Sequence, residues 1–287
     1  MMKEIHPATR RGPLLDGVLF QSQRKKSDTV VVAITGIHGN FHSNPFYYNI
    51  GETLNSGGID FIYAQTNDAF PQIRTPNILT GKEEIIGSWN ERFAYTDDDI
   101  GAYLGFVKQA GYRHIYLAGH SLGANKVISY LSRHHDMRVE KFIFLSPANL
   151  GYMMRDVTED EKAFIRAEVK RGRGDRLLPF PFMGWVECIA DTACDWLSGS
   201  LDNVHTGHDE DFTQAACITH AGALLIGTLD RFTDGDPAGF LENLNSHLPT
   251  KTENRLLFIE GTGHTYQGKE QQVADLLLDT VSAWRKG

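Results

Sequence analysis

The clearest pattern along the chain is a series of short apolar runs that are rich in β-branched and aromatic residues. Most of them are apolar almost throughout, which is typical of strands buried on both faces of a parallel sheet. An earlier run, residues 14–21, has the pattern of an antiparallel edge strand or one arm of a hairpin. The other predicted strands are residues 29–35, 59–64, 114–118, 141–145, 223–226 and 255–259.

Helical patterns lie between these runs. Thr96 and the three aspartates after it predict a helix start, because acidic side chains suit the positive N-terminal end of a helix. Apolar residues then recur at helical spacing, and Gly111 is a plausible stop. A second apolar face predicts a helix near the C-terminal end of the chain, formed by Val273, Leu276, Leu277, Val281 and Trp284. Strands that alternate with helices predict an α/β fold, with a mostly parallel sheet of about eight strands flanked by helices.

One stretch, from residue 151 to residue 211, breaks this alternation. It contains a charged helix-like piece, a segment rich in Gly, Arg and Pro, and an aromatic-rich piece. We therefore expect residues 1–150 and 212–287 to form one core, and residues 151–211 to form an inserted cap or lid over one edge of the sheet.

Composition narrows the classes of protein to consider. The 287 residues carry a formal net charge of −8, which argues against a non-specific nucleic-acid binder. No apolar run reaches the roughly 18 residues that a transmembrane helix needs, and no secretory signal is visible. The three cysteines have neither disulfide-framework nor zinc-ligand spacing. We expect a cytoplasmic protein with reduced thiols.

Residues 119–123 read Gly-His-Ser-Leu-Gly, a G-x-S-x-G motif. A predicted strand ends directly before it and a helix-compatible run follows it, which is the context of a nucleophile elbow. Ser121 would then stand at the carboxyl edge of the sheet, beside the positive end of the following helix. The alternative interpretation is a glycine-rich strand–helix turn with an idle serine.

Two further residues complete a candidate catalytic triad. A base and an acid should follow the serine in the order Ser, Asp or Glu, His. His264 lies just after the last predicted strand, in the sequence Gly-Thr-Gly-His, and Asp230 lies just after the strand before it. His264 would take the proton of Ser121, and Asp230 would hold the imidazole in the correct tautomer. Asp234 and Asp236 are close enough in sequence to be rivals for the acid.

An oxyanion hole requires two backbone N–H donors. One is expected from Leu122, the residue after the nucleophile. The loop after the first long strand contains His38 and Gly39, a pair that suits a turn over the nucleophile. Asn40 is the expected second donor, although His38 and Gly39 also fit a role that only shapes the loop.

Taken together, these motifs resemble the α/β-hydrolase superfamily across residues 30–284, in particular its bacterial carboxylesterase-like members. The resemblance implies a hydrolase of carboxylic esters, thioesters or lactones, with Ser121 as the nucleophile. The chain departs from many relatives after the His-Gly pair, where Asn40, Phe41 and His42 replace a glycine-rich extension. A C–C hydrolase or a lyase uses the same triad, and a non-catalytic binding protein with this fold is a further alternative.

The remaining candidates concern the ligand. No dinucleotide-binding, phosphate-loop or HExxH motif is present, so we expect no cofactor and no metal. The expected partner is a small-molecule ester, and His38, Gly39, His120 and Trp185 are the candidate substrate-binding residues. Trp185 and its aromatic neighbours suit either a substrate pocket or the cap's own core. The arginines of residues 171–176 suit either an anchor for an acidic substrate or a solvated loop.

Overall fold

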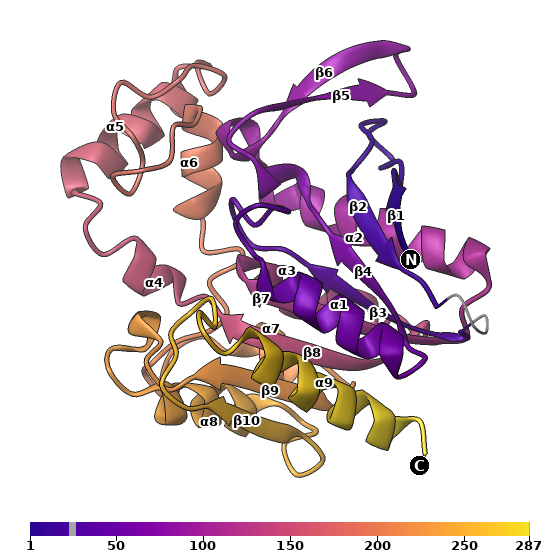
Figure 1. Ribbon diagram of the computed structural model, residues 1–287. Coiled ribbons are helices and arrows are strands. Elements are labelled where there is room, and N and C mark those ends of the chain that lie inside the picture. Colours follow the sequence, from indigo (N-terminus) through magenta and orange to yellow (C-terminus); the bar gives the residue numbers. More distant parts are fainter. Residues whose placement is uncertain (23–26, 287) are drawn as a thin grey trace.

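A computed structural model describes residues 1–22 and 27–286, which are built around one eight-stranded sheet (Figure 1). The strand order is β1-β2-β4-β3-β7-β8-β9-β10. β2 runs antiparallel to β1 and β4, and the remaining neighbours are parallel, so the predicted mostly parallel sheet is confirmed. The strands are β1 (Met2–Ile5), β2 (Gly17–Phe20), β3 (Thr29–Ile34), β4 (Asp60–Ala64), β7 (His114–Ser121), β8 (Val139–Pro147), β9 (Gly222–Gly227) and β10 (Arg255–Ile259).

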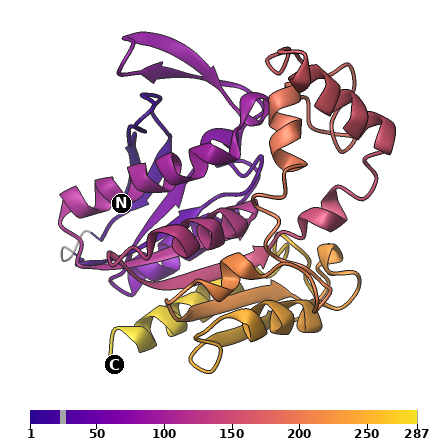
Figure 2. The same ribbon diagram turned by 180° about the vertical axis from the view of Figure 1, so that it is seen from behind.

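Helices cover both faces of this sheet. Alternate residues of β3 point to opposite sides, because side chains in a strand alternate with period two. Val31 and Ala33 pack with α1 (Phe46–Ser56) and α9 (Glu270–Trp284), which lie in front of the sheet in Figure 1. Val30, Val32 and Ile34 pack toward the opposite face. That face, seen in Figure 2, is covered by α2 (Thr96–Ala110), α3 (Leu122–His134), α7 (Thr213–Ala216) and α8 (Pro237–His247).

The predicted helix boundaries at Thr96 and Gly111 are confirmed. Gly111 ends α2 in the left-handed conformation with φ of 87°, where glycine pays no steric cost. The sequence pattern missed several elements, among them β1 and a separate two-stranded sheet formed by β5 (Ile73–Asn77) and β6 (Lys82–Ile86). Short 3-10 turns are η1 (Asn67–Ala69), η2 (Ser88–Asn90), η3 (Phe93–Tyr95) and η4 (Arg231–Thr233). Among the described residues, no helix is long and apolar enough to cross a membrane.

Residues 151–211 contribute mainly short helices and loops between β8 and β9. The helices are α4 (Leu150–Met153), α5 (Glu159–Lys170) and α6 (Ala190–Trp196), which form a lobe beyond the carboxyl ends of the strands (Figure 1). The lobe has a hydrophobic cluster that includes Phe182, Val186 and Trp196, and this cluster continues onto Leu122 at the start of α3. The lobe is thereby packed against the end of the sheet where a loop-borne site would lie.

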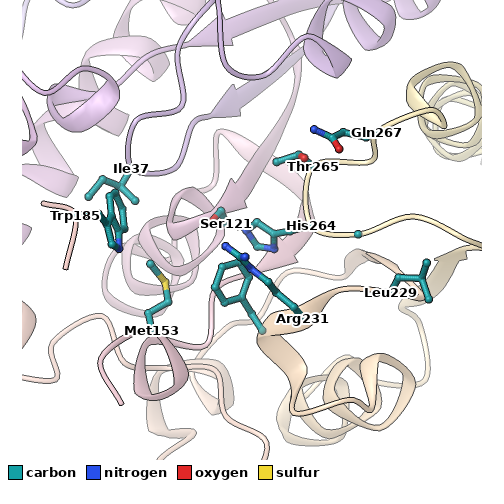
Figure 3. Close-up of a pocket in the computed structure, with 11 residues that line it drawn as sticks. Ile37, Ser121, Met153, Trp185, Leu229, Arg231, His264, Thr265 and Gln267 are labelled. Carbon is teal, nitrogen blue, oxygen red and sulfur yellow. Dashed lines mark hydrogen bonds between the residues drawn. The ribbon is translucent and has the colours of Figure 1, made fainter. Parts of the chain in front are cut away.

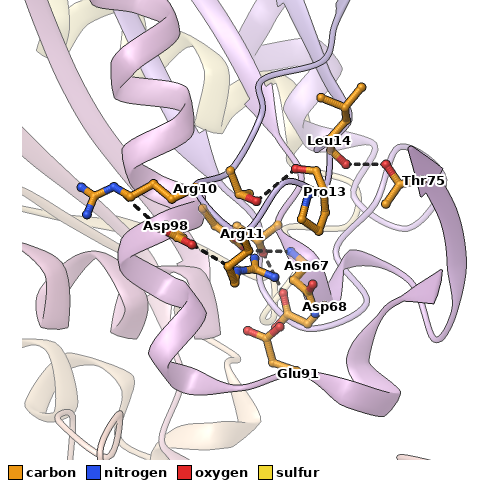
Figure 4. Close-up of polar contacts among 12 residues, drawn as sticks. Arg10, Arg11, Pro13, Leu14, Asn67, Asp68, Thr75, Glu91 and Asp98 are labelled. Atoms are coloured by element: carbon orange, nitrogen blue, oxygen red, sulfur yellow. Dashed lines mark hydrogen bonds and ion pairs between the residues drawn. The ribbon is translucent and has the colours of Figure 1, made fainter. Parts of the chain in front are cut away.

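A buried group of charges lies behind α3. The Lys126 side chain is fully buried, and its Nζ lies 2.8 Å from Asp68 Oδ1 and 3.0 Å from Glu91 Oε1. Buried Asp99 lies in the same region and forms an ion pair with Arg11, with 2.7 Å between Asp99 Oδ1 and a terminal guanidinium nitrogen. Figure 4 shows Arg11 reaching toward Asp98 beside Asn67, Asp68 and Glu91. Burial raises the pKa of Glu91 to about 8 despite the nearby Lys126, so Glu91 is largely protonated at neutral pH.

Lys126→Met should strongly destabilise the fold, because it leaves the buried carboxyl groups of Asp68 and Glu91 without their cation. Removal of one partner from a buried ion pair costs about 3–5 kcal/mol. The matched control is Arg133→Met on the same helix, where Arg133 is 49% exposed and pairs with Asp97 at 2.8 Å. That surface pair contributes less than about 1 kcal/mol. Urea denaturation monitored by circular dichroism measures both losses, and equal losses would contradict a structural role for the buried charge.

Candidate active site

The Gly-His-Ser-Leu-Gly motif forms a tight turn between β7 and α3. Ser121 ends the strand with φ of 55° and ψ of −130°, a strained conformation for a non-glycine residue. A Cβ on Gly119 would lie 2.3 Å from the Gly123 carbonyl oxygen, and one on Gly123 would lie 2.4 Å from the Ile34 carbonyl oxygen. The turn therefore has no room for side chains at either glycine, and it presents Ser121 at the carboxyl edge of the sheet.

Three side chains from three strand ends meet at this edge. His264 Nε2 lies 2.8 Å from Ser121 Oγ, and His264 Nδ1 lies 2.8 Å from Asp230 Oδ2. Burial alone would raise the pKa of Asp230, but His264 and the Phe232 amide outweigh it and hold that pKa below its ordinary value. Asp230 is therefore ionised at neutral pH and can stabilise a cationic imidazole.

The two rival aspartates have other partners. Asp234 Oδ2 accepts a hydrogen bond from Thr206 Oγ1 at 3.2 Å. Asp236 caps α8, where its side chain accepts from the Gly239 amide at 2.9 Å. Of the three candidates, Asp230 is the one that the structure brings to His264.

His120 lies behind the site rather than in it, contrary to the predicted substrate contact. The residue is 3% exposed, and its ring packs against Phe46 and Tyr266. Its Nε2 donates to the backbone carbonyl of His264 at 2.8 Å, so it fixes the loop that carries His264. Burial lowers the pKa of His120 to about 3, which keeps the imidazole neutral.

The Asn40 amide does not face the nucleophile, contrary to its predicted role as oxyanion donor. Its N–H donates to Ser43 Oγ at 2.9 Å, and its side-chain amide donates to the Ala69 carbonyl at 2.9 Å. Gly39 is also turned inward: a Cβ there would lie 2.7 Å from the Asn44 side chain. These residues hold the loop in shape, which was the alternative left open for the His-Gly pair.

Gly36 and Ile37, rather than Gly39 and Asn40, lie close to the nucleophile turn. A Cβ on Gly36 would lie 2.9 Å from Ser121 Cβ and 3.1 Å from the Leu122 nitrogen. Ile37 lines the pocket that contains Ser121 (Figure 3). The sequence held a signal for this: Gly36 follows β3 almost directly, and a glycine so close to a strand end often permits close backbone approach.

A pocket of about 610 Å³ opens at Ser121 and His264. In Figure 3, Ile37, Met153 and Trp185 stand together on one side of the serine. Trp185 thus lines the pocket, as predicted, whereas His38 does not. The His38 ring packs against the indole of Trp185, at 5.3 Å between centroids, and His38 Nε2 lies 2.7 Å from Ser88 Oγ. The other lining residues are Leu229, Arg231, Phe232, Gly263, Thr265 and Gln267.

Sequence reasoning missed several of these lining residues, and the chain gives little signal for them. Met153 comes from α4 and Arg231 from η4, so their approach to Ser121 depends on how the lobe and the loop fold. Across residues 1–22 and 27–286, no group of three or more His, Cys, Asp or Glu side chains is arranged to hold a metal ion.

By sequence, the chain matches no protein-family model and no curated protein. By structure, the α/β hydrolase GrgF from Penicillium sp. sh18 is similar, with a TM-score of 0.67 at 15% identity over 99% of this chain and 98% of that one. The chain has the α/β-hydrolase fold. This confirms the fold that the resemblance implied, and at this identity the likeness concerns the fold alone.

Two further solved structures are similar to this chain. The esterase EaEST from Exiguobacterium antarcticum has a TM-score of 0.61 at 19% identity, over 99% of this chain and 100% of that one. Est1E from Butyrivibrio proteoclasticus, in a structure with ferulic acid bound, has a TM-score of 0.67 at 16% identity, over 97% of this chain and 99% of that one.

Gly123→Ala should disrupt the elbow of this α/β-hydrolase fold, because the new methyl group meets the backbone oxygens of Ile34 and Thr35. Overpacking of this kind costs about 1–3 kcal/mol, or more where only backbone atoms can move. The control is Gly105→Ala in α2, where a Cβ meets nothing within 4 Å. That change should instead stabilise the helix by about 0.5–1 kcal/mol. Thermal unfolding of both variants distinguishes the expected loss of stability from the expected gain. An unchanged unfolding temperature in Gly123→Ala would contradict the close packing.

Proposed function

We propose that the protein is a serine hydrolase that cleaves a carboxylic ester of a small molecule through Ser121, His264 and Asp230. The observation that carries this proposal is the continuous hydrogen-bonded series from Ser121 Oγ through His264 to Asp230, at 2.8 Å for each contact. The structurally similar EaEST is an esterase, so ester hydrolysis occurs on a fold of this kind. The site opens into a pocket large enough for a small ester.

The reaction proceeds in two acyl-transfer steps. His264 Nε2 accepts the proton of Ser121 as the oxygen attacks the ester carbonyl, and Asp230 stabilises the imidazolium that forms. The tetrahedral intermediate collapses, the alcohol leaves with the proton from His264, and an acyl group remains on Ser121. Water then gives a proton to His264 and attacks the acyl carbon, which releases the acid and restores the serine.

The oxyanion is held by the amides of Leu122 and Ile37. Leu122 begins α3, where its N–H has no acceptor within the helix and the helix dipole favours negative charge. Ile37 follows Gly36, whose backbone lies against the elbow, and takes the place first given to Asn40. Both donors come from backbone that is fixed by packing, so little reorganisation is needed when charge develops.

Residues 151–211 act as a cap on a core formed by residues 1–150 and 212–287. Met153 and Trp185 come from this segment and line the pocket beside Ser121. Trp185 is 46% exposed, so a bound ligand can cover apolar surface that is otherwise in contact with solvent. The cap supplies the apolar wall, and the core supplies the reacting groups.

Ser121→Ala should lower the kcat for 4-nitrophenyl butyrate by about 10³-fold or more, because the nucleophile is lost. Asp230→Asn should lower kcat by roughly 10⁴-fold, since the wrong imidazole tautomer is favoured. The matched control is Asp234→Asn, a neighbouring aspartate bound to Thr206, which should retain activity. Steady-state release of 4-nitrophenol measures all three. Full activity in Ser121→Ala, or equal losses in the two aspartate variants, would contradict the assignment.

Replacement of the Ile37 amide by an ester, through incorporation of the matching α-hydroxy acid, should lower kcat by about 10²–10³-fold. This change removes one N–H and keeps the side chain, and loss of a single oxyanion donor has an effect of that size. The same replacement at Asn40 removes a hydrogen bond to Ser43 and should leave kcat nearly unchanged. A larger loss at residue 40 than at residue 37 would restore the original assignment of Asn40.

A further inference from the structure

Arg231 occupies an unusual place in this pocket. It directly follows Asp230, and it lines the cavity together with Ser121 and His264 (Figure 3). Its guanidinium carbon lies 4.9 Å from the centre of the Phe232 ring. The edge of the same ring meets His264, at 4.6 Å between centroids. Phe232 therefore contacts both the guanidinium and the imidazole, at the reacting end of the cavity.

The charge of Arg231 has no carboxylate partner within residues 1–22 and 27–286. Among the residues that the structure describes, Arg231 forms no ion pair, although the partly exposed Arg92 and Arg138 do. No aspartate or glutamate of the described part of the chain lines the pocket. A protein with a net charge of −8 thus keeps an unpaired cation beside its nucleophile. An unpaired guanidinium in a cavity is a ready binding group for a carboxylate, which it can hold with two parallel hydrogen bonds.

The remaining lining residues separate into two kinds. The apolar side chains Ile37, Met153 and Trp185 stand on one side of Ser121 in Figure 3, and Arg231 stands on another. A ligand that bridges these sides has an ester group at Ser121, an apolar part against the cap, and a negative charge at Arg231.

We propose that Arg231 binds a carboxylate of the substrate, so that the preferred esters carry an additional ionised carboxyl group. This inference rests on the proposed ester hydrolysis at Ser121. The arginines of residues 171–176, which the sequence offered as an acidic-substrate anchor, do not line the pocket. Arg171 and Arg173 instead pair with Glu168 at the end of α5. Arg231 takes the anchoring role from another part of the chain.

The test compares matched anionic and neutral esters. On the acyl side, the pair is mono-4-nitrophenyl glutarate and 4-nitrophenyl pentanoate; on the alcohol side, it is 4-acetoxybenzoate and 4-methylphenyl acetate. Arg231→Gln should lower the ratio of kcat/KM for the anionic ester over the neutral one by roughly five- to tenfold, a modest factor because Arg231 is exposed. The pair that responds shows which half of the substrate carries the charge.

Two further measurements identify the effect as electrostatic contact. The control Arg255→Gln removes the same charge from the first residue of β10. Arg255 lies at the amino ends of the parallel strands, whereas Ser121 lies at their carboxyl ends, so this change should leave the ratio unchanged. Raising the salt concentration from 50 to 500 mM should raise KM for the responding anionic ester in the wild type and much less in Arg231→Gln, because salt screens exposed charges.

The proposal and the ester chemistry fail in different ways. If both ester pairs are cleaved in a Ser121-dependent manner and neither ratio changes in Arg231→Gln, the carboxylate site is wrong and the hydrolase stands. If no ester is cleaved, calorimetry on the Ser121→Ala protein decides. That protein should bind the mono-anilide of glutaric acid more tightly than pentananilide, or 4-acetamidobenzoate more tightly than 4-methylacetanilide. Loss of that preference in Ser121→Ala/Arg231→Gln supports the site, and no preference in either protein overturns it.

Discussion

The arrangement of the site depends on the buried charge of Lys126. Its ammonium group binds the Asp68 carboxylate behind α3, the helix that begins directly after Ser121. The backbone carbonyl of the same Asp68 accepts the His38 amide at 2.9 Å, within the loop that also carries Ile37. One residue thus joins the nucleophile helix to the loop over it. A buried ion pair is a costly way to hold two elements, but its geometry is specific, and the proposed oxyanion donors sit on these two elements.

Protonation of Glu91 reduces the excess of negative charge around Lys126. Asp68, Glu91 and Asp99 are buried near one ammonium group and the partly exposed Arg11. Three ionised carboxylates there would repel one another in a medium of low dielectric constant. Burial of Glu91 raises its pKa to about 8, so the cluster holds a proton at neutral pH. The stability linked to this raised pKa is fully present below the ordinary pKa of a glutamate and is lost as the pH rises through about 8.

The sequence predicted the meeting of Ser121, His264 and Asp230 because each follows a strand of one parallel sheet. The carboxyl ends of such strands share an edge, so topology alone brings their loops together. Asn40 was misplaced for the opposite reason. The direction of an amide within a loop depends on local turn geometry, here the hydrogen bond from the Asn40 N–H to Ser43, which residue spacing does not encode. Arg231 was not predicted as a pocket residue, because the surrounding sequence does not indicate which residue of the loop turns toward the cavity.

The neutrality of His120 has a consequence for how the site handles protons. Its ring lies 5.0 Å from that of His264, close enough for a charge on one to oppose a charge on the other. With a pKa of about 3, His120 stays uncharged wherever the fold is intact at ordinary pH. In the proposed mechanism, His264 is therefore the one imidazole of this pair that exchanges a proton. His120 is thus a neutral neighbour of the proposed base, and its Nε2–H donates to the backbone carbonyl of His264.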